Sequence, residues 1–323
     1  MPRLIAAGAG EPIGVADLHE ALEASGVDPR DEDGFASLSP LLARLGCNAT
    51  FLADLAIAEL KRDFAGQAGN GYGPQVLMLR PPTGRFALRA NFWPARDDAV
   101  VRAGGTDAFF YDLAHDHNFS FLTYGYLGPG YWSDYYRFDG APRLPGDPAG
   151  LVFEERARLE PGRLMLYRAH RDVHVQLPPD AFSVSLNVLA QAPGQAWRSQ
   201  YRFDVAADRV IEELTVARSE ALLTIATAVG DGVELACFLA RRHPAGRMRR
   251  TALAALSVAA HAGVFEAATG DRDPLVARVA RARLAGQAEP KPAPARRSRS
   301  EVQSAAHERS APLGTLAPDT RPG

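Results

Sequence analysis

Residues 114–131 read AHDHNFSFLTYGYLGPGY, and this stretch decides the fold expected of the chain. It begins with an HxH pair, His115 and His117, and ends in a turn rich in glycine and proline. On a β-strand, residues two apart project from the same face, so both imidazoles can reach one ion. The stretch therefore predicts a β-strand protein with a metal site on its strands.

A second stretch, residues 160–177, reads EPGRLMLYRAHRDVHVQL and supplies the remaining ligand. A Pro-Gly turn leads into an apolar strand, and His174 follows on a second β-like run. His170, four residues earlier, is a rival for the same role. Asp172 is a further alternative, because two histidines and one carboxylate form a common iron site. We take His174 as the third ligand and keep both alternatives open.

Short β-like runs broken by Pro and Gly surround these motifs and predict a β-sandwich or barrel within an α+β chain. The expected strands are residues 75–79, 85–93, 118–126, 132–138, 151–159, 163–167, 173–177 and 182–189.

The spacing of apolar residues changes at two points and divides the chain. Residues 1–66 form an expected N-terminal helical segment, which ends at the glycine-rich GQAGNGYG. Residues 67–204 form the β-barrel with the metal site, and a helical period returns in residues 205–284. Residues 285–323 contain almost no large apolar side chains, so we expect a disordered tail.

An HxH pair before a glycine turn, followed by a Pro-Gly turn and a third histidine, resembles the two motifs of the cupin superfamily. The resemblance covers residues 74–190 and implies a central cupin-like antiparallel β-barrel, a double-stranded β-helix, flanked by helices. Most cupins carry a glutamate four or five positions after the second histidine, where this chain has Phe121 and Leu122. Without this glutamate, the chain resembles the three-histidine subset of cupins, which includes thiol dioxygenases.

Three neutral imidazoles leave a bound ion with its full 2+ charge and with open coordination positions. Imidazole suits iron, copper, nickel and zinc alike, and manganese is a further option; the resemblance favours Fe(II). It implies a non-haem iron oxygenase, a dioxygenase or hydroxylase, acting on a polar small-molecule or peptide-borne substrate. One alternative is a non-catalytic metal- or ligand-binding cupin module whose helical flanks bind partners. Another is a 2-oxoglutarate-type oxygenase with a carboxylate ligand.

Candidate substrate-binding groups lie on two of the expected strands. Residues 84–93 alternate strictly, which places Arg89 and Asn91 on a polar face that either meets solvent or lines the cavity. In three-histidine thiol dioxygenases an arginine holds the substrate carboxylate, and we give Arg89 that substrate-binding and catalytic role. Tyr124 and Tyr126 share one face of the strand after the HxH pair. We expect Tyr124 to act in catalysis and Tyr126 in substrate binding.

The overall composition limits the kinds of binding partner expected for the chain. The chain is 46% hydrophobic and 23% charged with a net charge of −2, so neither nucleic acid nor a membrane is expected as a partner. Two distant cysteines, Cys47 and Cys237, fit a reducing cytoplasmic setting. The helical flanks can cover the barrel mouth or form a homodimer.

Overall fold

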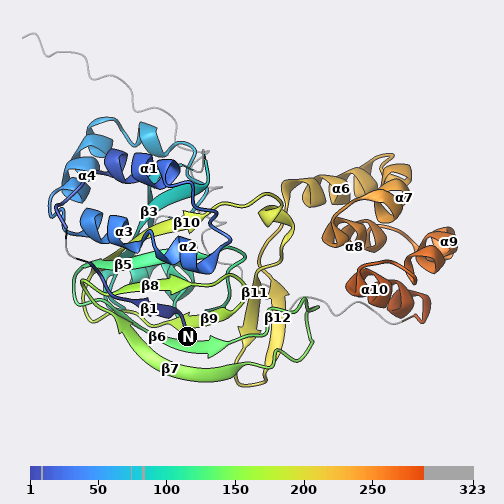
Figure 1. Cartoon of the computed structure of the whole chain (residues 1–323). Helices are drawn as coiled ribbons and strands as arrows, with labels where there is room; N and C mark the ends of the chain where they lie inside the picture. Colours follow the sequence, from blue (N-terminus) through green and yellow to red (C-terminus); the bar gives the residue numbers. More distant parts are fainter. Residues whose placement is uncertain (9, 74, 82–83, 287–323) are drawn as a thin grey trace, which may run out of the picture.

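The structure is a computed structural model that describes residues 1–8, 10–73, 75–81 and 84–286. Two six-stranded antiparallel sheets face each other, with helices over one of them and a helical unit to the side (Figure 1). The first sheet has the order β1-β8-β5-β10-β3-β2, and its strands are β1 (Arg3–Ile5), β2 (Val76–Arg80), β3 (Phe86–Trp93), β5 (Phe121–Leu127), β8 (Leu164–Tyr167) and β10 (Ser183–Ala190). The second sheet has the order β12-β11-β4-β9-β6-β7, and its strands are β4 (Ala114–His115), β6 (Tyr131–Arg137), β7 (Val152–Leu159), β9 (Asp172–Gln176), β11 (Tyr201–Asp204) and β12 (Arg209–Glu213).

The α+β class is confirmed, and the two sheets are consistent with a cupin-like fold. The single barrel is not confirmed, because neither sheet closes on itself within the described residues.

The first sheet is buried on both faces. Phe86 and Leu88 of β3 point outward and pack, with Leu122 of β5, against the N-terminal helices. Ala87 and Trp93, on the opposite face of β3, pack between the two sheets. Period-2 alternation produces this division, because successive side chains of a strand project to opposite faces.

Helices α1 (Val15–Ala24), α2 (Glu32–Ala36), α3 (Ser39–Gly46) and α4 (Phe51–Lys61) cover the outer face of the first sheet (Figure 1). Asp17 accepts a hydrogen bond from the Gly14 N–H at 3.0 Å, which caps the start of α1. A short helix, α5 (Ala99–Gly104), lies between β3 and β4. Within the described residues no single helix has the length and apolar character to cross a membrane; one helix pair, Glu32–Gly46 with Phe51–Lys61, meets both criteria together but is bent by 72°.

The helical period expected for residues 205–284 is wrong for the first part of this range. Residues 209–213 form strand β12, which pairs with β11 and extends the second sheet. Helices begin only at α6 (Arg218–Val229), followed by α7 (Val233–Arg242), α8 (Gly246–Ala254), α9 (Val258–Ala268) and α10 (Pro274–Leu284). These five share a core of their own. The expected tail lies outside the described residues, apart from Ala285 and Gly286.

Candidate metal centre

Two strands of the second sheet bring the histidines together. His115 on β4 lies directly opposite His174 on β9 in the antiparallel register, and His117 follows two residues after His115. One ring nitrogen from each of the three histidines lies within 4.8 Å of the others. His115 and His174 are buried, at 3% and 0% exposed, and His117 is partly buried.

The spacing of the ring nitrogens fits a transition metal ion. The Nε2 atoms of His115 and His174 are 3.1 Å apart. Two neighbouring ligands on an ion with metal–nitrogen bonds of about 2.1 Å would stand roughly 3.0–3.4 Å apart. The Nδ1 atoms of His117 and His174 are buried without a hydrogen-bond partner among the described residues. The donor set therefore suits an ion that prefers imidazole.

The protonation of the imidazoles also suits metal binding. The Nδ1 atom of His115 lies 2.9 Å from the carbonyl oxygen of Leu113, which can only accept, so Nδ1 carries the proton and Nε2 keeps its lone pair. Burial lowers the pKa of His115. Burial and the neighbouring histidines hold the pKa values of His117 and His174 well below the usual range. All three imidazoles are thus neutral at pH 7.

The alternative ligands are engaged elsewhere. Both carboxylate oxygens of Asp172 accept hydrogen bonds from Arg168, at 2.7 and 3.0 Å. Asp116 accepts the Tyr201 N–H at 2.5 Å with one oxygen and lies 3.4 Å from Nδ1 of His170 with the other. Within the described residues the group that could hold a metal ion therefore contains His115, His117 and His174, without His170 or a carboxylate.

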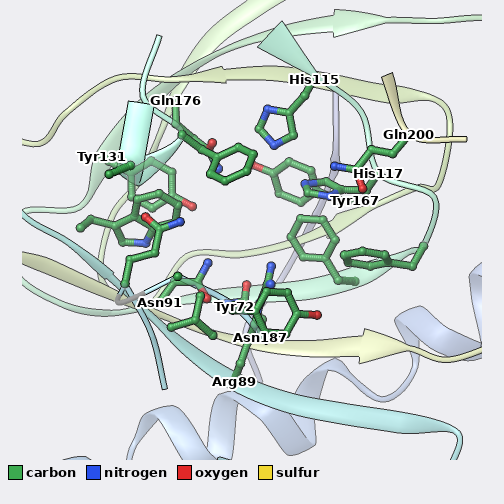
Figure 2. A pocket seen from close by; sticks show the side chains of 18 residues that line it. Tyr72, Arg89, Asn91, His115, His117, Tyr131, Tyr167, Gln176, Asn187 and Gln200 are labelled. Atoms are coloured by element: carbon green, nitrogen blue, oxygen red, sulfur yellow. The ribbon is translucent and has the colours of Figure 1, made fainter. Parts of the chain in front are cut away.

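A cavity of about 160 Å³ lies between the sheets and opens onto His115 and His117. Aromatic side chains form much of its wall, namely Tyr72, Trp93, Phe110, Phe119, Phe121, Tyr131 and Tyr167. Figure 2 shows His115 and His117 on one side and Arg89 with Asn187 on the opposite side. An apolar cavity of about 150 Å³ holds benzene, so the space suits a small molecule or a single side chain.

The polar face of β3 lines this cavity and does not meet solvent. Arg89 and Asn91 are 7% and 6% exposed and both border the cavity. The Arg89 guanidinium lies 4.9 Å from the centre of the Tyr72 ring, and no carboxylate of the described residues forms an ion pair with it. Burial lowers the pKa of Arg89. Its charge in turn lowers the pKa values of His115 and His117. An unpaired buried cation opposite a metal site is suited to an anionic ligand.

Tyr124 and Tyr126 are not brought to the histidines, which corrects the expectation placed on them. Both side chains point from β5 towards the N-terminal helices, where the Tyr124 ring packs beside Gly46 and the Tyr126 hydroxyl donates to the Asn48 carbonyl at 2.9 Å. Their shared parity was correctly predicted. The opposite face of β5 borders the cavity, where Phe121 is one of the lining residues.

Sequence reasoning missed several lining residues. Asn187 is the lone amide in the buried strand β10 and lies directly across from Arg89. Gln176 stands two residues after His174, on the same face of β9. Tyr167 ends β8, and its hydroxyl lies 2.8 Å from that of Tyr135. A polar residue within an apolar strand was the available signal for Asn187.

Comparison with known proteins adds little to this geometry. No family model matches the chain, and no curated protein matches it. Among solved structures it is similar to a hydroquinone 1,2-dioxygenase from Sphingomonas sp. (TM-score 0.26, 8% identity, covering 40% of this chain and 72% of that one). It is also similar to a cupin domain from Bordetella pertussis (0.23, 14%, 38% and 96%) and to a cadmium-bound acireductone dioxygenase from Bacillus anthracis (0.23, 12%, 43% and 64%).

Only the second of these three structures is described as a cupin domain. The chain is an α+β protein of two facing sheets, with a three-histidine group of which His115 and His174 are buried.

Proposed function

We propose that the chain is a cupin-type oxygenase that uses Fe(II) held by His115, His117 and His174. The observation that carries this proposal is the convergence of three neutral imidazoles, two buried and one partly buried, beside a small cavity whose opposite wall holds an unpaired guanidinium. The bound metal would supply a Lewis-acidic, redox-active centre with coordination positions left open. This arrangement is similar to the three-histidine subset that includes thiol dioxygenases.

The cavity residues would bind and orient the substrate. Arg89 would hold its anionic group, while Asn91 and Asn187 offer both hydrogen-bond donors and acceptors. The aromatic wall would exclude water from the reacting end of the substrate. Burial raises the pKa of Tyr167 well above its usual range, so its hydroxyl stays protonated and can donate a hydrogen bond.

A requirement for 2-oxoglutarate is not part of the proposal, because that co-substrate usually accompanies a carboxylate ligand. The nearby carboxylates, Asp116 and Asp172, already accept hydrogen bonds from Tyr201 and Arg168. Adding 2-oxoglutarate to the anaerobic Fe(II) protein should therefore give no visible charge-transfer band. A band lost in an Asp172→Ala or Asp116→Ala variant, but not after loss of one histidine, would favour the two-histidine-one-carboxylate site.

Metal analysis tests the centre directly. Protein purified without a histidine tag should contain about one equivalent of divalent transition metal, and His115→Ala and His174→Ala should each lose most of it. His261→Ala, which changes a histidine outside the cluster, should retain the metal. Full retention in both cluster variants would refute the metal site. Oxygen consumption by the Fe(II) protein, measured across small carboxylates and thiols, then tests the oxygenase activity.

A further inference from the structure

Helix α6 is apolar on two opposite sides. Leu223, 3% exposed, and the buried Glu220 face the helical unit, where Glu220 pairs with Arg247 at 2.9 Å. On the other side Leu222, Ile225 and Val229 are 65%, 57% and 83% exposed. Large apolar side chains that share one face of a helix are ordinarily buried, so the outward side of α6 lacks a covering element in the described chain.

The exposed stripe has the spacing of a helix–helix seam. Leu222, Ile225 and Val229 are three and four residues apart, which places them on one face. Ala221 and Ala228 are also exposed beside the stripe, and small side chains let a second helix approach closely. Contiguous exposed apolar surface of this kind marks an interaction site.

The charges at the two ends of the stripe are opposite and unpaired. Arg218 begins α6 and Asp231 follows its last turn; neither forms an ion pair with another described residue. The midpoint between them falls at Thr224–Ile225, which is also the centre of the apolar stripe. A second copy of α6, laid antiparallel across this point, would place each Arg218 opposite Asp231 of the other copy.

We propose that α6 is the contact through which two copies of this chain associate, with the two helices antiparallel about a two-fold axis near Ile225. A two-fold contact uses the same patch on both copies and must be self-complementary, which the Arg218/Asp231 arrangement satisfies. Leu235 and Phe238 on the following helix, α7, are also exposed, at 50% and 59%. The proposal does not depend on the oxygenase function.

Charge reversal tests the antiparallel register. The full chain should sediment as a dimer in a concentration series. Arg218→Asp and Asp231→Arg should each weaken the dimer about tenfold, since each brings like charges together. The double variant, Arg218→Asp with Asp231→Arg, should restore it because both pairs are re-formed with exchanged signs. Single variants that dimerise like the parent would refute this register.

Cross-linking tests the contact even where association is weak. With Cys47→Ser and Cys237→Ser as background, Ile225→Cys should form an intermolecular disulfide on mild oxidation, because the two thiols meet near the axis. The matched control is Leu60→Cys, 64% exposed on α4, which should not cross-link. A monomeric full chain without the Ile225→Cys cross-link would overturn the proposal and leave the face to a different partner or to residues 287–323.

Discussion

Arg89 is a buried, positively charged side chain on the wall of the cavity. Its guanidinium is buried beside Tyr72 and has no carboxylate partner among the described residues. A buried charge without a counter-charge destabilises a folded protein, and functional sites retain such groups because a ligand supplies the counter-charge. The unpaired charge of Arg89 thus lowers the stability of the ligand-free protein and favours the binding of an anion.

Replacing this charge should separate stability from binding. We expect Arg89→Met to raise the free energy of unfolding of the ligand-free protein by about 1 kcal/mol or more, because the unpaired charge is removed. The variant should keep its metal and lose the response of cavity-lining Trp93 fluorescence to benzoate as a probe anion. Arg85→Met, which removes the ion pair with Glu23, is the control and should bind benzoate like the parent. A destabilised Arg89→Met protein that still binds benzoate would contradict this role.

The buried imidazoles should also make the metal-free protein sensitive to acid. The pKa values of His115, His117 and His174 are lowered in the folded state, whereas in the unfolded chain they lie near 6.5. Below about pH 6.5 the unfolded state therefore binds more protons, and the free energy of unfolding falls as the pH decreases. Urea unfolding of the metal-free protein at about pH 7.5 and 5.5 measures this loss.

A variant carrying His117→Asn and His174→Asn should lose less stability between these two pH values than the parent. His261→Asn should lose as much as the parent, because His261 lies outside the cluster. An equal loss in all three proteins would assign the acid sensitivity to groups other than the metal cluster.

At the scale of elements, the turn between β5 and β6 joins the two sheets and depends on glycine. Gly130 has φ +79°, and a Cβ there would lie 2.1 Å from the carbonyl oxygen of Leu159. A residue other than glycine at position 130 would therefore adopt this backbone conformation with difficulty. Its Cβ would also clash with the Leu159 carbonyl oxygen.

We expect Gly130→Ala to reduce the free energy of unfolding by about 2 kcal/mol or more, since backbone strain and a clash with a main-chain oxygen add. Gly150→Ala is the matched control, because Gly150 also has a positive φ, +68°, but nothing within 4 Å of a Cβ. Its smaller loss in thermal or urea unfolding would measure the strain alone. Equal losses in the two variants would show that the close approach at Leu159 is relieved at no cost.

At the scale of the whole molecule, composition predicts that the last residues are dispensable for folding. Residues 285–323 contain almost no large apolar side chains to bury, so a chain ending at Ala285 should melt within a few degrees of the full chain. Differential scanning calorimetry of the two proteins measures the difference. A large decrease in the melting temperature would show that these residues contribute to the folded structure.

The sequence by itself determined the features that depend on local periodicity. Spacing of two residues placed His115 with His117, and alternation placed Arg89 with Asn91 and Tyr124 with Tyr126. Turn residues marked eight of the strands, because Gly tolerates the positive φ of turns and Pro fixes φ locally. The helical period expected over residues 205–284 failed at residues 209–213, where pairing with β11 outweighed local preference.

Only the tertiary structure decided which face of each strand meets the cavity. Alternation separates two faces but cannot say which is inside when both are buried, as they are on the first sheet. Arg89 therefore borders the cavity, whereas Tyr124 packs under the helices. The grouping of His174, rather than His170 or Asp172, with the other two histidines likewise depends on tertiary contacts, namely the pairing of β4 with β9 and the contact of Asp172 with Arg168. Such contacts join residues far apart in the chain, and no local pattern encodes them.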